Sequence, residues 1–293
     1  MDWIITVSKA ERESRALSPG TAEAVVRALH ASGAALLRGV FAEDLVEGLY
    51  REFLTQFGDM DAAEMDACVQ SRPPHPYMKV GDKRFDVAPR MVGAFADPTV
   101  FADPLLLNLL YQRLGFDMRL GAFTVVASFP GATAKPHHRD HPHLYPEGGL
   151  GSVLPTHAIN AAVPLIDVDI EMGPTGIWLG SHRWPEDRAP EPEAVTIVPF
   201  RRGDVALLDY RTLHSGVPNH SDTMRPILYM TYSRTWFFDE TNYAARKPVD
   251  MPLETLQALP ESSRKLLLRV YAQIMRSRQG AGGTNMAPSE RAV

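Results

Sequence analysis

The chain has 293 residues, a formal net charge of −5 and a single cysteine, Cys68. This length is enough for one large domain or two small ones. The acidic balance argues against a general nucleic-acid binder, and one cysteine excludes an intrachain disulfide and a thiolate-rich zinc site. No apolar run approaches the roughly 20 residues that span a bilayer, and the first residues lack the apolar stretch of a secretory signal. We therefore expect a cytoplasmic protein with neither a membrane nor a nucleic acid as its partner.

The N-terminal part predicts helices around one short strand. Apolar residues recur at helical spacing in residues 21–29 and 43–57, and a glycine, Gly33 or Gly58, follows each run. Between them, "AALLRGV" at residues 34–40 is typical of a buried strand. Residues 59–100 show no period, so we expect an irregular segment with one short strand near residues 83–87. Another helix should begin at "ADPLLLNLLYQRLG", where Asp103 can cap it and Pro104 suits its first turn.

The pattern changes after residue 120. Short β-rich runs separated by Gly and Pro indicate an antiparallel sandwich or barrel. These runs are "GAFTVVASF", "THAINAAVPLI", "TGIWLG", "AVTIVPF", "DVALLDY" and "PILYMTYSRTWFF". We expect one domain over residues 1–279, mainly β with flanking helices. It would have a helical N-terminal layer (20–115), a β-core (about 120–240) and a C-terminal helix (253–278), followed by a disordered tail (280–293).

A histidine-rich segment, "KPHHRDHPHLYPEGG", begins at Lys135. In an extended chain, residues i and i+2 point to the same side, so His138 and Asp140 can converge on one ion while His137 faces away. The best third ligand is His214, which ends the strand-like run "GDVALLDYRTLH". Two imidazoles and one carboxylate form the facial triad of non-haem Fe(II) oxygenases, although the same ligands could hold catalytic zinc.

A positively charged residue, Arg225, follows the proposed triad and begins the run "RPILYMTYS". The guanidinium of Arg225 could bind one carboxylate of a dicarboxylic acid while the other end of that acid chelates the metal. Taken alone, Arg225 could equally be an ordinary surface arginine.

Together, these residues resemble the Fe(II)- and 2-oxoglutarate-dependent dioxygenases of the phytanoyl-CoA dioxygenase superfamily. The matching features are "HRD" at 138–140, "MGPTGIWLGSHRW" at 172–184 and "HSGVPN…RP" at 214–226. The resemblance covers roughly residues 20–240 and implies a double-stranded β-helix, the jelly-roll core of cupin-like proteins. It also implies Fe(II) with 2-oxoglutarate and O₂ as cosubstrates.

The resemblance assigns roles to single residues. It makes His138, Asp140 and His214 the iron ligands and Arg225 the partner of the distal carboxylate of 2-oxoglutarate. Thr175 matches a position that often binds the cosubstrate. Further candidates for cosubstrate contacts are Asn160, a polar residue in an apolar run, and Lys135, where many relatives carry glutamine.

The implied reaction hydroxylates or otherwise oxidises a C–H bond and releases succinate and CO₂. We expect a small or medium-sized metabolite as substrate, in natural-product biosynthesis, bound between the metal, the loop 141–156 and the segment 59–100. Basic residues of that segment, Lys83 and Arg84 among them, could meet an anionic group or simply be solvated. Candidate substrate contacts are Tyr77, Met78, Lys79, Met91, His141, Trp236 and Phe238.

Two alternatives stay open. One is a metalloenzyme of another kind on a cupin-like barrel, such as an isomerase or hydrolase, and the other is a silent member of the fold that binds a metabolite. The position oxidised, the outcome of the oxidation and the role of loop 141–156 as a lid do not follow from the sequence. A homodimer is compatible with it.

Overall fold

The fold is built around a large sheet in a computed structural model that describes residues 2–58, 60–70, 76–145, 149–243 and 247–282. Eight strands lie in the order β1-β2-β8-β6-β10-β5-β4-β3, and β7 pairs with β9 in a second, small sheet. Neighbouring strands are antiparallel except β1 and β2. The strands are β1 (Ile4–Thr6), β2 (Ala34–Arg38), β3 (Tyr77–Gly81), β4 (Arg84–Val87), β5 (Arg119–Ser128), β6 (Ala158–Pro164), β7 (Thr175–Ile177), β8 (Val205–Asp209), β9 (His214–Gly216) and β10 (Arg225–Ser233).

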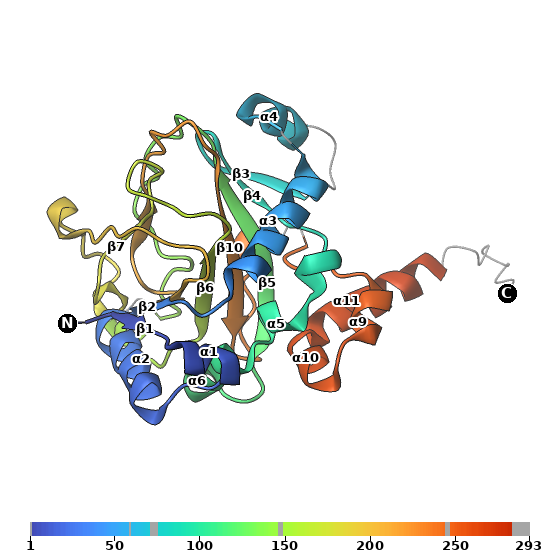
Figure 1. Ribbon diagram of the computed structural model, residues 1–293, viewed down its shortest axis with the longest axis horizontal. Coiled ribbons are helices and arrows are strands. Elements are labelled where there is room, and N and C mark those ends of the chain that lie inside the picture. Colours follow the sequence, from blue (N-terminus) through green and yellow to red (C-terminus); the bar gives the residue numbers. More distant parts are fainter. Residues whose placement is uncertain (1, 59, 71–75, 146–148, 244–246, 283–293) are drawn as a thin grey trace, which may run out of the picture.

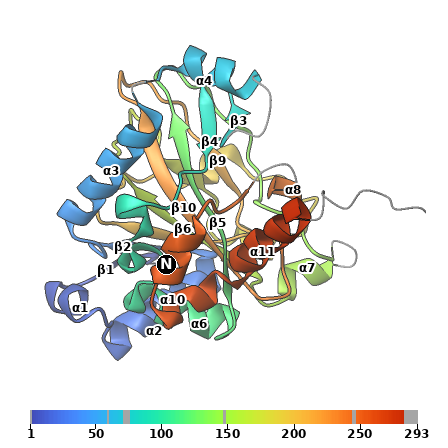
Figure 2. The same cartoon turned by 90° about the vertical axis from the view of Figure 1, so that its right-hand side faces the viewer.

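Helices and the small sheet cover opposite sides of the large sheet. Figure 1 shows α3, α5 and α9–α11 on one side and β7 with its loops on the other. Figure 2 shows α9–α11 in front of the strands, with α7 at the edge of the molecule. The α-helices are α1 (Lys9–Ser14), α2 (Pro19–Ser32), α3 (Glu43–Phe57), α4 (Ala62–Gln70), α5 (Pro98–Phe101), α6 (Pro104–Leu114), α7 (Leu150–Val153), α8 (Glu240–Tyr243), α9 (Leu253–Ala258), α10 (Glu261–Leu266) and α11 (Leu268–Gly282).

The three central strands are buried on both faces. Every residue of β6 is buried, as are most residues of β5 and β10. A strand buried on both sides reads as a continuous apolar run, which explains the lack of alternation in "AINAAVP". One apolar cluster extends from Trp3 to Val270 and so joins the N-terminal layer, the sheet and the C-terminal helices. The single-domain organisation stays a prediction.

The predicted ends of the N-terminal helices are confirmed. Helix α2 ends at Gly33, whose φ of 69° is left-handed, and α3 ends at Gly58 with a φ of 65°. Helix α6 begins after Asp103, whose carboxylate accepts a hydrogen bond from the backbone N–H of Leu106 at 3.1 Å. These caps satisfy terminal backbone groups that the helices leave without partners.

The prediction of an irregular segment 59–100 with one strand was wrong. The described part of this segment contains α4, the β3–β4 hairpin, a 3₁₀ turn at Gly93–Ala96 and α5. Helix α4 buries one residue, Met65, so the helical period is too weak to detect from the sequence. The hairpin turn places Lys83 at a φ of 49°, which is unusual for a residue other than glycine and carries little sequence signal.

Two further predictions need correction. "AVTIVPF" makes isolated bridges, Ile177 to Thr196 and Val168 to Phe200, in place of a strand. The C-terminal helix 253–278 is three helices, α9, α10 and α11. The first break comes at Leu259, which is extended because the ring of Pro260 disfavours a helical residue before it. Residues 280–282 of the expected tail continue α11, and residues 283–293 lie outside the described part.

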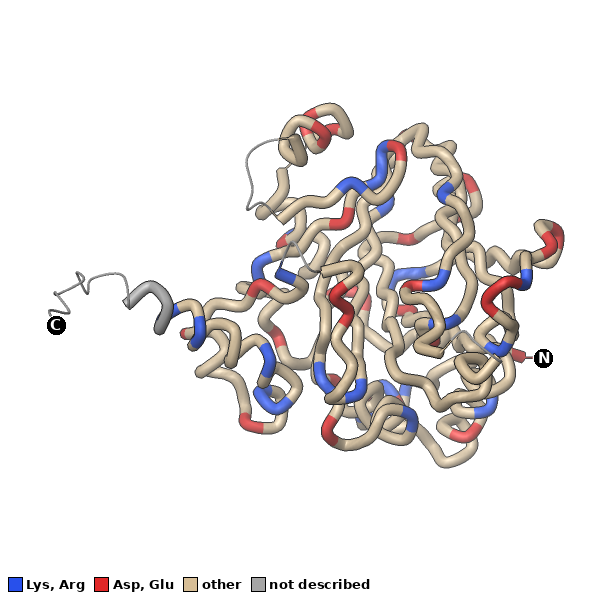
Figure 3. The backbone as a smooth tube through the Cα atoms, turned by 180° about the vertical axis from the view of Figure 1, so that it is seen from behind, with Lys and Arg blue, Asp and Glu red and all other residues tan. Residues whose placement is uncertain are grey.

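Basic and acidic residues are interspersed along the chain, as the coloured tube of Figure 3 shows. Within the described residues, no helix combines the length and the apolar character that crossing a membrane requires.

Gly33 connects α2 to the site-bearing strands and generates the first prediction. Its carbonyl accepts hydrogen bonds from Asp209 N–H at 2.9 Å and from the hydroxyl of Thr212 at 2.9 Å. A Cβ at this position would overlap Thr212 Oγ1 and the imidazole of His182.

We expect Gly33→Ala to lower the free energy of unfolding by about 2–4 kcal/mol, because left-handed strain and overlap add. The matched control is Gly20→Ala, because Gly20 lies in the first turn of α2 with open space around it. It should leave stability unchanged or raise it by up to about 1 kcal/mol. Urea unfolding followed by circular dichroism measures both; equal midpoints for the two variants would refute the prediction.

Candidate metal centre and active site

His138 and His214 are brought together by their main chains. The N–H of His138 donates to the carbonyl of His214 at 2.9 Å, and the N–H of His214 donates back at 3.0 Å. This is an isolated antiparallel bridge. The two imidazole centroids lie 4.4 Å apart as a result. Residues far apart in the chain therefore present their rings to the same point.

Each ring is oriented by a backbone carbonyl two residues earlier. Nδ1 of His138 lies 3.0 Å from the carbonyl oxygen of Pro136, and Nδ1 of His214 lies 3.0 Å from that of Thr212. A carbonyl accepts only, so both Nδ1 atoms carry the proton. Both Nε2 atoms are thereby left with lone pairs, which is the tautomer that a metal requires.

Asp140 completes the cluster through a chain of polar contacts. Its Oδ1 lies 3.5 Å from Nε2 of His214. Its Oδ2 accepts a hydrogen bond from the amide of Asn160 at 2.9 Å, and Asn160 Oδ1 accepts one from the hydroxyl of Thr231 at 2.5 Å. Asn160 thus fixes one carboxylate oxygen and leaves the other facing the histidines.

The donor set fits a divalent metal ion. Ligand atoms of His138, Asp140 and His214 all lie within 4.8 Å of one another. Burial is the main cause that lowers the pKa of His138 to about 2, and the neighbouring His214 and Lys135 add to it, so this ring is neutral and ready to bind. Burial raises the pKa of Asp140 in the absence of an ion, and a divalent cation would offset that cost.

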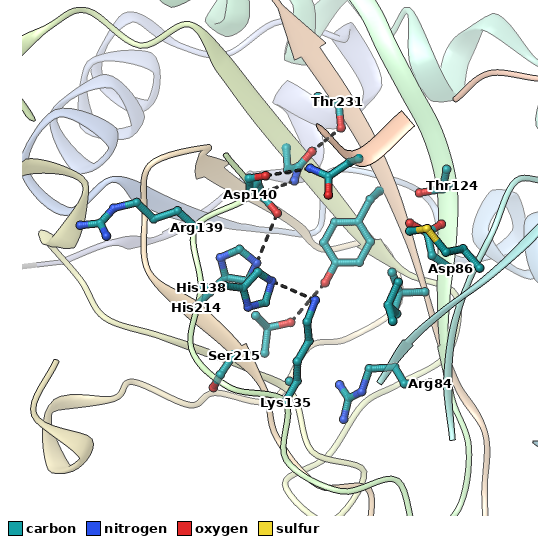
Figure 4. Close-up of a pocket in the computed structure, with 18 of the residues that line it drawn as sticks. Arg84, Asp86, Thr124, Lys135, His138, Arg139, Asp140, His214, Ser215 and Thr231 are labelled. Atoms are coloured by element: carbon teal, nitrogen blue, oxygen red, sulfur yellow. Dashed lines mark hydrogen bonds and ion pairs between the residues drawn. The ribbon is translucent and has the colours of Figure 1, made fainter. Parts of the chain in front are cut away.

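Lys135 reaches into the same place. Its Nζ lies 3.1 Å from Nε2 of His138, and its N–H donates to the carbonyl of Gly216 at 2.8 Å. Figure 4 shows the ammonium between the histidines and the side of the pocket where Arg84 lies. A metal on Nε2 would displace the ammonium from this contact but keep it within the cavity.

Two buried arginines flank one serine on the sheet. Arg84 of β4 and Arg225 of β10 both pair with Ser128 of β5, so the three side chains lie in one row on the same face. Burial, and then the charge of Arg84, lowers the pKa of Arg225 to about 10. Arg225 is 2% exposed, and its Nε and Nη1 find no hydrogen-bond partner among the described residues. Buried donors in this state call for an acceptor.

The three candidate ligands line one cavity of about 150 Å³ together with Lys135, Arg84 and Arg225. Alternate residues of β10, namely Arg225, Tyr229 and Thr231, point into the cavity. The hydroxyl of Thr175 lies 3.3 Å from that of Tyr229. Several lining residues were not expected from the sequence, namely Val80, Asp86, Thr124, Val126, Arg139, Ser215, Gly216, Tyr229, Thr231, Asn242 and Tyr243. Some of them could have been found from the two-residue period of a β-strand, because alternate residues of "RFDV" and "RPILYMTYS" lie on one face.

Of the expected substrate contacts, one lines the cavity and the others do not. Met78 lines the cavity, whereas its strand neighbours face away: Tyr77 packs against Phe57, and Lys79 pairs with Asp66 at 2.7 Å. The remaining candidates also lie outside the lining. Met91 is in the core, Trp236 is 63% exposed, Phe238 packs under Arg269 and His141 packs against Phe237.

The rest of the histidine cluster serves packing. His137 is exposed beside Trp178, on the side away from the metal ligands, as predicted. His143 is buried, and its N–H donates to Glu186 at 3.0 Å. The loop 141–156 therefore has an anchor near its start, and residues 146–148 lie outside the described part.

A jelly-roll sheet that carries two histidines and an aspartate beside a buried arginine defines the class of non-haem iron, 2-oxoglutarate-dependent enzymes. Residues 29–227 match the family described as phytanoyl-CoA dioxygenase (PhyH). The chain belongs to this family. The expected family, fold class and dependence on iron and 2-oxoglutarate are confirmed.

Individual relatives are distant. The chain is 26% identical over 187 residues to the iron/alpha-ketoglutarate-dependent dioxygenase penM of Penicillium thymicola, across 59% of this chain and 58% of that protein. It resembles the structure of the epimerase SnoN from nogalamycin biosynthesis, with 20% identity and a TM-score of 0.53, over 74% of this chain and 82% of that one. The structure of HygX from Streptomyces hygroscopicus, with nickel, 2-oxoglutarate and hygromycin B bound, matches at 16% identity and a TM-score of 0.55, over 76% and 90% of the chains. At these identities the structures show the fold alone.

Metal affinity tests the assignment of the histidines. We expect His214→Ala to abolish binding of Co(II), because it removes one of three ligand atoms, while His137→Ala binds as the wild type does. Visible absorption of the Co(II) complex measures both. Equal loss in the two variants, with both proteins folded, would refute the assignment.

A second prediction concerns the orientation of Asp140. Asn160→Ala should weaken Co(II) binding by about 10–100-fold, because the carboxylate loses the hydrogen bond that aims it. Asn108→Ala is the matched control, since Asn108 is exposed on α6. Competition against a chelator measures the affinities. An unchanged affinity in Asn160→Ala would show that the hydrogen bond does not orient Asp140.

Proposed function

We propose that this protein is an Fe(II)- and 2-oxoglutarate-dependent oxygenase that oxidises a C–H bond of a small or medium-sized metabolite. In this proposal His138, Asp140 and His214 hold the iron, and Arg225 binds the distal carboxylate of 2-oxoglutarate. One observation carries it: two buried, unpartnered guanidinium nitrogens of Arg225 line the same cavity as the three ligands. A metalloenzyme that does not use 2-oxoglutarate, such as a hydrolase, has no need of a dicarboxylate clamp at that place.

The charges of the cavity support a dicarboxylate. Arg84, Lys135, Arg139 and Arg225 bring four positive charges, and Asp86 and Asp140 bring two negative ones. A divalent metal ion adds two more positive charges, so a dianion would offset part of the surplus. Low dielectric makes this attraction stronger than it would be in water.

In this proposal the cosubstrates and the cavity residues have separate roles. Iron with 2-oxoglutarate and O₂ supplies the oxidation of a C–H bond, with release of succinate and CO₂. Arg225 fixes the far end of the cosubstrate, and the paired hydroxyls of Thr175 and Tyr229 are placed to donate to it. Lys135 can move its ammonium from His138 to a carboxylate when the metal takes Nε2. The buried wall keeps water from the reacting atoms.

We infer that the substrate approaches from the other side of His138. A second cavity of about 430 Å³ shares His138 and Arg139 with the first one. It is lined by polar and charged side chains, including Glu186, Asp187 and Arg188. Such a wall suits a polar substrate, in keeping with natural-product biosynthesis, from which the relatives SnoN and SnoK come.

A reaction other than hydroxylation is a second candidate for the outcome of the oxidation. SnoN is described as an epimerase and SnoK as a carbocyclase, so the same centre supports reactions other than hydroxylation. The position of the substrate C–H bonds around His138 and Asp140 would decide between them. Asp140 fills the carboxylate position of the triad, which favours oxygen insertion over halogenation, and hydroxylation is our primary proposal.

Cosubstrate binding tests the proposal. Fe(II) and 2-oxoglutarate, added without oxygen, should give a visible charge-transfer band, and admission of air should yield succinate. Arg225→Gln should bind iron normally but require at least about tenfold more 2-oxoglutarate, because a charge-assisted contact is lost. Arg51→Gln is the matched control, since Arg51 is exposed on α3. A folded, iron-loaded protein that gives neither band nor succinate would refute the oxygenase function.

A further inference from the structure

A third cavity, which we call the arginine pocket, lies apart from the metal centre. It has a volume of about 590 Å³ and shares no lining residue with the metal-site cavity. Four arginines line it: Arg113 of α6, Arg183 after β7, Arg211 after β8 and Arg234 after β10. No Asp or Glu is among its described lining residues.

One of the four charges is neutralised. Arg211 forms a two-pronged ion pair with Asp209, at 2.9 Å from Nε to Oδ1 and 2.8 Å from Nη2 to Oδ2. The hydroxyl of Thr156 donates to the same carboxylate. Both charged partners are buried. Asp209 is thereby paired with Arg211, and its charge offsets only part of the charge of the other three arginines.

The other arginines keep their charge. Arg234 donates from Nε to the carbonyl of Thr156 at 2.9 Å and from Nη2 to that of Arg113 at 2.9 Å. Carbonyls satisfy donors but do not cancel a positive charge. Nε of Arg113 is buried and has no hydrogen-bond partner, and the guanidinium of Arg183 is exposed without an ion pair, among the described residues.

The charges act on one another. Burial lowers the pKa of Arg113, and the positive charges of Arg211, Arg183 and Arg234 lower it further against the pull of Asp209. Arg183 is also the main cause of the lowered pKa of His30 at the same pocket. Like charges held this close destabilise the protein unless an anion joins them.

We propose that the arginine pocket binds a phosphate group, as free phosphate or as the monoester of an organic ligand. This goes beyond the proposed function, since it adds a site distinct from that of the cosubstrate. Guanidinium groups match phosphate oxygens in paired hydrogen bonds, and a dianion offsets more of the surplus than one carboxylate can. The cavity is larger than one ion, and Val153, Leu154 and Pro155 give it an apolar wall.

The pocket also borders the segment that follows the metal ligand Asp140. Arg211 donates to the carbonyls of Gly151 and Leu154, near the end of loop 141–156. A bound phosphate would therefore sit against the part of the loop that Arg211 already holds.

The experiment is isothermal titration calorimetry with inorganic phosphate and with phenyl phosphate. The protein is first loaded with Ni(II) and 2-oxoglutarate, so that anions cannot bind at Arg225. We expect each probe to bind at one site and to displace the other. Tighter binding of phenyl phosphate identifies an organic monoester as the ligand, and equal affinity identifies free phosphate. No saturable heat from either probe would overturn the proposal.

Variants locate the site. Arg183→Gln should weaken binding by about tenfold, and Arg183→Glu should weaken it more, because the charge reverses. Arg183 is exposed and its charge adds to the repulsion in the pocket, so neither variant should lower the melting temperature. Arg51→Gln, far from the pocket on α3, should bind both probes as the wild type does. Unchanged affinity in Arg183→Glu would place the phosphate elsewhere and overturn the proposal.

Discussion

The pairing of two backbone segments at His138 and His214 is the constraint on which the site depends. Two reciprocal hydrogen bonds of 2.9 and 3.0 Å set the separation of the imidazoles, and two carbonyls set their tautomers. None of these four contacts uses the metal-binding atoms. The backbone thus prepares the ligands before an ion arrives, so little ordering is left to oppose binding.

Strand β10 fixes the distance between Arg225 and the polar chain that holds Asp140. Thr231 and Arg225 lie on one face of β10; Thr231 holds Asn160, which aims Asp140, while Arg225 lies at the start of the strand. Strand residues two apart are separated by a fixed rise of about 6.6 Å, so the separation of Thr231 and Arg225 is set by the backbone. In the function that we propose, this separation would select a dicarboxylate by length as well as by charge.

The sequence was informative where local chemistry decides the structure. Asp103–Pro104 and Gly33 mark helix ends because caps need those residue types, and the spacing of His138 and Asp140 identifies ligands because strand geometry is fixed. It failed where tertiary contacts decide. Tyr77 and Met78 are adjacent, yet Met78 alone lines the cavity, since this depends on the register of β3 against β4. The hydrogen bond from the Asn160 amide to Asp140 likewise depends on tertiary contacts, while the predicted contact of Asn160 with the cosubstrate stays a prediction.

The metal-site cavity and the arginine pocket differ in their distribution of charge. Around the metal centre four positive side chains face two carboxylates, so opposite charges already meet inside the cavity. The described lining of the arginine pocket includes no carboxylate; Asp209 beside it is paired with Arg211, and three other arginines remain. Both cavities meet β10, one at Arg225 and the other at Arg234 just past its last residue. A protein of net charge −5 that nevertheless gathers uncompensated arginines at one place has concentrated positive potential locally, and the physical reason for tolerating that repulsion is an anion that relieves it.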